Sequence, residues 1–264
     1  MPERVRDVWA AGEPYEQYVG RWSRAVAREF LTWLDMPSGQ LWADVGCGTG
    51  ALAAGILATA GPQAIFAADR SAGFLAFARD AIPDPRAFFA VADACALPWT
   101  SGQCDITVSG LMLNFVPDAA AALREMARVT RPGGRIALYV WDYQDGMEMM
   151  RCFWDAAAAV DQRAAALDEG GRFPLCRPEP LRALFEAVGL RAVAVRPIDI
   201  PTVFPDFDAY WTPFLGGQGA APAYLASLDP QTREQVRAGL RARLGTADGS
   251  IALTARAWAA QGTV

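Results

Sequence analysis

Residues 41 to 50, Leu-Trp-Ala-Asp-Val-Gly-Cys-Gly-Thr-Gly, constrain the fold more than any other stretch of the chain. A short apolar run, Leu41 to Val45, contains one acid, Asp44, and leads into three alternating glycines. An alanine-rich segment follows, so the pattern predicts a buried strand, a tight turn and a helix. Glycines in such a turn allow positive φ angles and let a ligand lie directly against the backbone.

The glycines alone leave the ligand of this turn open. Gly46-Cys47-Gly48-Thr49-Gly50-Ala51 satisfies one form of the dinucleotide fingerprint, which marks a nicotinamide or flavin site. The same turn is compatible with a site for S-adenosylmethionine (SAM), and a purely structural turn is the third alternative. The acidic residues near the turn distinguish between these three alternatives.

The rest of the chain alternates between apolar runs and helical patterns, which predicts a doubly wound α/β fold with a parallel sheet covered on both faces. Ser23 is the candidate cap of a helix before the first strand, and Ser71 and Asp118 are the candidate caps of two later helices. Further strands are expected at 64–69, 87–91, 105–109, 135–141, 190–200 and 250–258, and helices at 72–80, 118–129, 178–188 and 230–244.

Asp69 closes the second predicted strand, at the position where an acid reaches the ribose hydroxyls of a nucleoside bound at the first turn. A helix cap is the alternative role for such an acid. The segment before the first strand carries Tyr15, Tyr18, Arg21 and Trp22, which we interpret as a candidate lid over the ligand because site loops commonly carry such residues.

Composition excludes several classes of protein. The net charge is −5 and no long basic run occurs, so the sequence lacks the electrostatic footprint of a nucleic-acid binder. The polar start shows no signal region, and the most apolar segment, 51–68, is interrupted by Gly61-Pro62, so we expect a cytoplasmic protein without a membrane span. Five cysteines without a C-x-x-C pair, and no histidine, argue against a metal site and exclude Ser-His-Asp and Cys-His hydrolases.

We expect residues 1–264 to form one domain with two insertions, at about 142–176 and 205–248, that cap a substrate site. The insertions leave the carboxyl edge or flank of the sheet, where ligands of such folds bind. Their aromatic side chains predict an apolar or aromatic small-molecule acceptor, although packing within the cap is the simpler role for them. These residues are Trp141, Tyr143, Phe153, Trp154, Phe173, Tyr210, Trp211 and Phe214.

Four blocks in this order resemble the class I SAM-dependent methyltransferases, and within them the type 11, ubiquinone-biosynthesis-like small-molecule enzymes. The blocks are Asp44-Val-Gly-Cys-Gly-Thr-Gly50, Asp69, Asp93-Ala94 and Arg131-Pro-Gly-Gly134. The resemblance implies a Rossmann-like, seven-stranded sheet whose last strand is antiparallel. It also implies methyl transfer from SAM to a small organic acceptor, with release of S-adenosylhomocysteine.

The resemblance assigns roles to individual residues. The backbone at Gly46, Gly48 and Gly50 would approach the methionine half of SAM, and Asp44 would support that loop and the amino group of the ligand. Asp69 would accept both ribose hydroxyls, Asp93 the adenine amino group, and the Ala94 N–H would reach a ring nitrogen. Ser109 would line the methyl-transfer edge, and the remaining expected cofactor residues are Cys47, Arg70 and Tyr18.

The charges of the ligand agree with these roles. SAM is a cation without phosphates, whereas Asp44 would repel the pyrophosphate of a dinucleotide. Ionised carboxylates only accept hydrogen bonds, which suits hydroxyls and an amine. A non-catalytic SAM-binding module and an NAD-dependent oxidoreductase remain as alternative functions.

The general base is the least defined part of the site. Many relatives carry a histidine near the position of Asn114, and this chain has none. Asp142 and Tyr143 are the candidates that follow the fifth strand, with Asp145 and Glu148 behind them, and for each alone a solvated loop residue is the simpler interpretation. An amine, thiolate or stabilised carbanion needs no such base, whereas a phenol or alcohol usually does.

Overall fold

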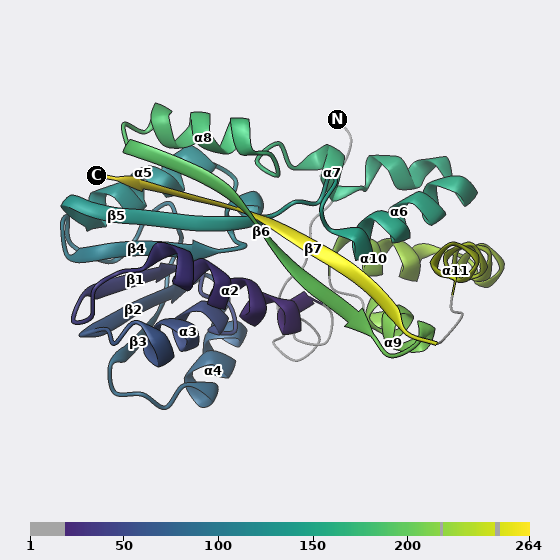
Figure 1. Cartoon of the computed structure of the whole chain (residues 1–264), viewed down its shortest axis with the longest axis horizontal. Helices are drawn as coiled ribbons and strands as arrows, with labels where there is room; N and C mark the ends of the chain where they lie inside the picture. Colours follow the sequence, from purple (N-terminus) through teal and green to yellow (C-terminus); the bar gives the residue numbers. More distant parts are fainter. Residues whose placement is uncertain (1–18, 217–218, 246–248) are drawn as a thin grey trace.

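The computed structural model describes residues 19–216, 219–245 and 249–264. The described residues form one seven-stranded sheet in the order β3-β2-β1-β4-β5-β7-β6, shown in Figure 1. All neighbouring strands are parallel except β7, which runs antiparallel to both β5 and β6. The strands are β1 Leu41–Val45, β2 Ala64–Asp69, β3 Ala87–Val91, β4 Cys104–Gly110, β5 Thr130–Trp141, β6 Arg191–Phe204 and β7 Ile251–Thr263.

This topology confirms the predicted fold, including the antiparallel last strand. Three strands extend beyond their predicted bounds, since β5 begins at Thr130 rather than at residue 135, β6 continues to Phe204 rather than to residue 200, and β7 continues to Thr263 rather than to residue 258. The Pro132-Gly133-Gly134 segment precedes the predicted strand, but in the structure it belongs to β5, with Gly133 at a φ of 76°. The pairing with β4 shifts register between Cys104 and Ile106, so the extra residues, including the glycines, form a bulge in β5.

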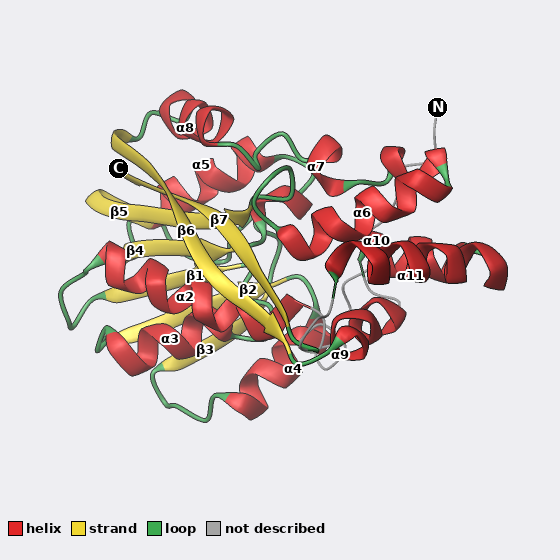
Figure 2. Cartoon of the chain, turned by 45° about the vertical axis from the view of Figure 1, so that its right-hand side comes forward, coloured by secondary structure: helices red, strands yellow, loops and turns green. Residues whose placement is uncertain are grey.

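Helices cover both faces of the sheet (Figure 2). α2, α3 and α4 belong to the larger core on one face, and α5 and α8 pack against the other face. Ser71 and Asp118 cap α4 and α5 as predicted. None of the helices among the described residues has both the length and the apolar character needed to cross a membrane. Their bounds are α2 Arg21–Leu34, α3 Ala51–Thr59, α4 Ala72–Ala81, α5 Ala119–Val129 and α8 Pro178–Ala187.

The predicted cap at Ser23 is wrong. α2 begins at Arg21, and Ser23 lies within its first turn, where the buried hydroxyl donates to the Val19 carbonyl oxygen at 3.5 Å. The apolar positions inside the helix were recognised correctly, since Val26, Phe30 and Leu34 are all buried. The start of the helix was placed too late because Ser23 has the side chain of a typical cap.

The β6–β7 pair extends well beyond the rest of the sheet. β5 pairs with β7 only as far as Trp141 opposite Ala257, whereas β6 and β7 remain paired to Phe204 opposite Ile251. Figure 1 shows this ribbon running out to a second group of helices. That group contains α6 Glu148–Val160, η3 Gln162–Ala166, α7 Glu169–Arg172, α9 Phe207–Trp211, η4 Thr212–Gly216, α10 Ala220–Ser227 and α11 Pro230–Leu244.

Aromatic side chains from both predicted insertions pack against one another in this group. Phe153 and Phe214 stack with ring centroids 4.5 Å apart, and both side chains are fully buried. The Tyr210 hydroxyl donates to the Met149 carbonyl oxygen at 2.8 Å, which ties α9 to α6. Most of the aromatic residues in the insertions therefore form the interior of the helical group.

Candidate functional site

Four strand ends meet at the carboxyl edge of the sheet. β4, β1, β2 and β3 are consecutive neighbours, so Ser109, Val45 and Asp69 end side by side. The first glycine turn is fixed to its neighbour, because the N–H groups of Gly46 and Cys47 both donate to the Ala68 carbonyl oxygen, at 2.7 and 3.0 Å. The chain crosses to opposite sides after β1 and β4, and ligands of open α/β sheets bind at such a switch point.

The glycines of the turn play different parts. Gly46 has a φ of 71°, and a Cβ there would lie 2.2 Å from Cγ of Met112, so protein atoms fill the space beside it. Gly48 has a φ of 55°, but a Cβ there would meet no atom within 4 Å. The backbone at Gly48 therefore faces open space, and that is where a ligand can approach it.

Asp44 is the most unusual residue of the site. Its side chain is fully buried, and neither carboxyl oxygen makes a hydrogen bond of ordinary geometry within the described residues, although the nearby Ala53 N–H lowers its pKa slightly. Burial and then the nearby Asp69 carboxyl raise the pKa of Asp44 to about 7. A buried carboxyl without a partner is costly, so this position indicates a group that a ligand completes.

Asp69 lies at the end of β2 with both oxygens turned toward backbone donors. One oxygen accepts from the Gly48 N–H at 2.9 Å, and the other accepts from the Ser71 N–H at 2.8 Å. Burial raises the pKa of Asp69, while these two N–H groups lower it. A carboxylate oxygen can accept more than one hydrogen bond, so Asp69 can hold the glycine turn and two ligand hydroxyls together.

The other expected cofactor residues lie around the same edge. The Ser109 hydroxyl is buried and donates to the Val45 carbonyl oxygen at 2.7 Å, so it joins β4 to β1 rather than pointing away from them. Asp93 is exposed and accepts from the Cys95 N–H at 2.8 Å, with Ala94 between them. Arg70 is exposed directly after Asp69.

Cys47 and Tyr18 are the remaining residues that were expected to bind the cofactor. Burial, together with the Asp44 and Asp69 carboxyls, raises the pKa of the Cys47 thiol well above its usual value, so the sulfur stays protonated. Tyr18 lies outside the described residues, as does Tyr15. Over the described ranges, no group of three or more cysteine or acidic side chains could hold a metal ion.

The electrostatics of this edge favour a cation. The Asp69 carboxyl raises the pKa of Asp44, and no basic side chain hydrogen-bonds to either acid within the described part of the chain, although the charge of Arg70 lowers the pKa of Asp69. SAM carries an ammonium group and a sulfonium, and both would offset this cost, whereas a pyrophosphate would add to it. The residues present at this edge therefore fit SAM.

The candidate bases after β5 are engaged in local structure. Asp142 is buried and accepts from the Asp145 N–H at 3.0 Å, in the turn that leads to α6. Tyr143 is buried beside Phe173, with ring centroids 5.7 Å apart. Glu148 accepts from the Thr254 N–H at 2.6 Å at the exposed start of α6. This geometry favours structural roles for all of them.

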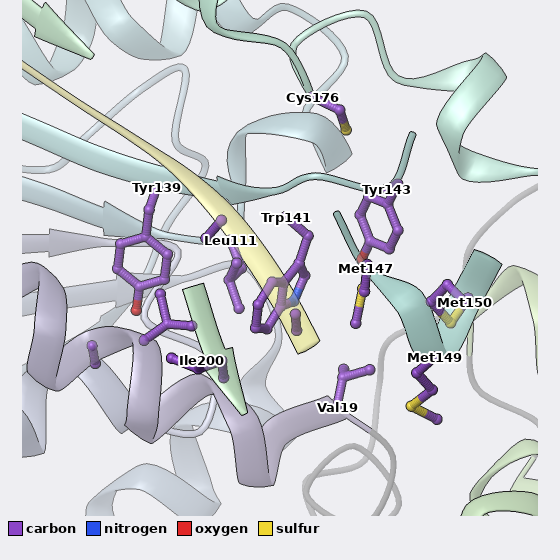
Figure 3. Close-up of a cluster of buried hydrophobic side chains, with 14 of the residues drawn as sticks. Val19, Leu111, Tyr139, Trp141, Tyr143, Met147, Met149, Met150, Cys176 and Ile200 are labelled. Carbon is purple, nitrogen blue, oxygen red and sulfur yellow. The ribbon is translucent and has the colours of Figure 1, made fainter. Parts of the chain in front are cut away.

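Three residues near the strand ends have structural features that the sequence did not predict. Leu111 has a φ of 63°, which is strained for a leucine and occurs directly after β4. The indole N–H of Trp141 and the side-chain oxygen of Asn114 are buried without a partner among the described residues. Figure 3 shows Leu111, Trp141 and Val19 around one cluster at this edge. Only a three-dimensional structure reveals such unpartnered atoms.

The sequence is similar to those of known methyltransferases. A family model described as a methyltransferase domain matches residues 43–138. Methyltransferase GfsG of Streptomyces halstedii is 31% identical over 203 residues, which cover 73% of this chain and 69% of that protein. The mouse tRNA (carboxymethyluridine(34)-5-O)-methyltransferase ALKBH8 is 38% identical over 124 residues, which cover 46% of this chain and only 17% of that protein.

A solved structure shares the fold. It is the phosphoethanolamine N-methyltransferase 2 of Haemonchus contortus, in complex with phosphomonomethylethanolamine and S-adenosylhomocysteine. It superposes with a TM-score of 0.58 at 17% identity, over 95% of this chain and 56% of that one. At this identity the likeness establishes the architecture alone.

Proposed function

The chain belongs to the class I SAM-dependent methyltransferases, and we propose that it methylates a small organic molecule with an apolar or aromatic body. The observation that carries the proposal is the fully buried, unpartnered Asp44 carboxyl beside Asp69 at the glycine turn. Family membership makes a nicotinamide oxidoreductase untenable. The small acceptor, the cytoplasmic location and the absence of a nucleic-acid partner remain predictions.

The mechanism we propose rests on positioning. SAM supplies an electrophilic methyl group on a sulfonium, and the departing sulfide needs no proton. The Gly46–Gly50 turn, Asp44 and Asp69 would hold the donor in one orientation, and the helical group around α6 and α10 would exclude water from the acceptor. Orientation and a dry site can lower the barrier of such a displacement by several kcal/mol, on the order of 7–11 in well-aligned model reactions.

Asp142→Asn tests whether a side-chain base takes part. The asparagine oxygen can still accept the Asp145 N–H, so the turn should survive. An amine, thiolate or carbanion acceptor needs no side-chain base, so we expect the turnover number with such an acceptor to change by less than about fivefold. Loss of a general base would instead lower the turnover number by roughly 10²–10⁴-fold. A drop of that larger size, with SAM affinity unchanged, would identify Asp142 as the base.

Asp69→Ala tests the ribose contact. Loss of hydrogen bonds to a charged acceptor should weaken SAM binding by roughly 1.5–3 kcal/mol. Asp69→Asn is the matched variant, since it keeps acceptor capacity for the Gly48 N–H without the charge. Calorimetry that shows unchanged SAM affinity in both variants would reject Asp69 as the ribose ligand.

Release of S-adenosylhomocysteine tests the function as a whole. The full chain is incubated with SAM and a panel of small amines, thiols, phenols and stabilised carbanions, and product is quantified by mass spectrometry. We expect acceptor-dependent release with at least one class. Binding of SAM without turnover on any member would support a non-catalytic module, and turnover only on an added tRNA fraction would favour an RNA acceptor of the kind named for the mouse relative.

A further inference from the structure

Arg21, the first residue of α2, has an unusual environment. Its guanidinium carbon lies 4.6 Å from the centroid of the Trp22 ring and 4.8 Å from that of Phe204, the last residue of β6. The two rings meet edge to face with centroids 5.7 Å apart. The cation is therefore held in place by two aromatic rings, and burial lowers the pKa of its guanidinium.

One edge of this guanidinium has no partner. Nε and Nη2 are both buried and donate to no acceptor among the described residues. These two nitrogens point their N–H bonds the same way, and this edge of arginine binds a carboxylate through two parallel hydrogen bonds. A buried guanidinium edge left empty costs free energy, and a ligand oxygen pair would recover it.

The acids nearest in the sequence to Phe204 are committed elsewhere. Asp199 pairs with Arg256 at 2.7 Å, Asp206 caps α9 through the Ala209 N–H at 2.7 Å, and Asp208 lies 3.2 Å from Arg237. Thus a chain with a net charge of −5 leaves Arg21 without an acidic partner in the part that the structure describes.

The two elements that contact Arg21 carry further unpartnered polar groups. The indole N–H of Trp22 is buried and unpartnered in the described structure, as is the hydroxyl of Thr202. Thr202 precedes Phe204 by two residues on β6, so both side chains face the same side of the strand, which is the buried side. An indole N–H only donates, and a hydroxyl can donate, so the surroundings of Arg21 call for acceptor oxygens.

Arg21 lies near the edge where methyl transfer is expected. Figure 3 places Val19, two residues before Arg21, and Ile200 in one cluster with Leu111 and Trp141. Ile200 lies four residues before Phe204 along β6, which corresponds to about 13 Å of extended strand. A molecule of moderate length could reach from Arg21 to the carboxyl ends of β4 and β5.

We propose that Arg21 determines acceptor specificity by binding a carboxylate on the far end of the methyl acceptor. The proposal rests on the proposed function, since it names the acceptor class of the same site. The acceptor is then an organic anion whose apolar body lies among Leu111, Trp141 and Ile200 and whose carboxylate pairs with the Nε–Nη2 edge. Trp22 and Phe204 fix the orientation of that edge.

Binding of three carboxylates to the full chain, with and without S-adenosylhomocysteine, tests the proposal. The probes are octanoate, cinnamate and biphenyl-4-carboxylate, each compared with its neutral amide by calorimetry up to the millimolar range. We expect at least one carboxylate to bind about tenfold or more tightly than its amide, and Arg21→Met to remove that preference. Arg21→Lys should restore only part of it, because lysine lacks the paired edge.

Arg28→Met is the matched control, since Arg28 is exposed on the same helix, and it should leave binding unchanged. SAM affinity should remain within about twofold of wild type in Arg21→Met, which also shows that the variant folds. The proposal is wrong if no carboxylate binds, if the amides bind equally well, or if Arg21→Met does not change the preference. A large loss of SAM affinity in Arg21→Met would instead assign Arg21 to the carboxylate of SAM. If the wild-type protein does not bind SAM, the proposed function is wrong. That result is distinct from a failure of the Arg21 proposal.

Discussion

Asp44→Asn is expected to weaken SAM binding more than 100-fold while raising the melting temperature of the ligand-free protein at pH 8. The loss follows because the ligand cation would be buried without its counter-charge, which costs roughly 3–5 kcal/mol. The melting temperature of the ligand-free protein should rise because the wild-type carboxyl is fully buried without a hydrogen-bond partner among the described residues. Asparagine has nearly the same shape and never ionises.

The sign of the pH dependence follows from the raised pKa. The carboxyl of Asp44 has a pKa of about 7 when folded and an ordinary value of 3.8. Between these values the unfolded chain releases a proton that the folded protein keeps, so wild-type stability falls as the pH rises from about 4 and levels off above about 7. The difference between Asp44→Asn and wild type should therefore be largest at pH 8 and vanish near pH 4.

SAM binding should show the opposite trend. Because the ligand cation favours ionised Asp44, wild-type affinity should fall as the pH drops below 7, by up to about tenfold per pH unit. Asp44→Asn should lose this dependence. Melting curves at pH 5 and pH 8, together with calorimetry at both values, check the two effects. A lower melting temperature for the variant at pH 8, or unchanged SAM affinity, would contradict the assigned role.

Gly46→Ala should destabilise the protein by roughly 2–5 kcal/mol. A left-handed backbone costs a non-glycine residue about 1–2 kcal/mol, and overpacking adds about 1–3. The added methyl would lie 2.2 Å from Cγ of Met112, with a φ of 71°. We expect a fall in melting temperature of about 4–20 °C, given a scaling of roughly 2–4 °C per kcal/mol for chains of this size.

Variants at two other glycines separate the cost of the left-handed backbone from the cost of overpacking. Gly39 has a φ of 78° and a Cβ there meets nothing within 4 Å, so Gly39→Ala should show the backbone cost alone. Met112→Ala in the Gly46→Ala background should recover part of the stability, which a double-mutant cycle measures. Gly48→Ala should resemble Gly39→Ala in stability but lose SAM affinity, because its Cβ enters the open space beside the turn. Equal losses of stability in Gly46→Ala and Gly39→Ala would show that Met112 does not fill this space.

The alternation of strands and helices and the neighbourhood of the acids could be predicted from the sequence because both depend on local pattern, whereas the antiparallel last strand was implied by the resemblance to the methyltransferase family. Asp44 and Asp69 stand at the ends of apolar runs, and parallel strands bring such ends to one edge. Ser71 and Asp118 cap helices through their nearest N–H groups, which is also a local property. At these positions a few neighbouring residues determine the geometry, and the prediction from pattern succeeded.

Long-range packing accounts for the differences. Ser23 has the side chain of a cap, but α2 begins before it, at Arg21. The glycines before Arg135 have the composition of a turn, but hydrogen bonds between Gly133 and Gly134 and the backbone of Val264 keep them in the sheet. The unpartnered edge of Arg21 depends on Phe204, which is 183 residues away in the sequence. No local pattern contains such a contact.

Titration of the wild-type chain with SAM at pH 8, followed by calorimetry, tests the central claim most directly, with NAD as the comparison ligand. We predict one SAM bound per chain, an accompanying rise in melting temperature, and no heat with NAD. If SAM produced neither heat nor a rise in melting temperature, the carboxyls at the glycine turn would not form a SAM site, and the functions proposed for the surrounding residues would be wrong.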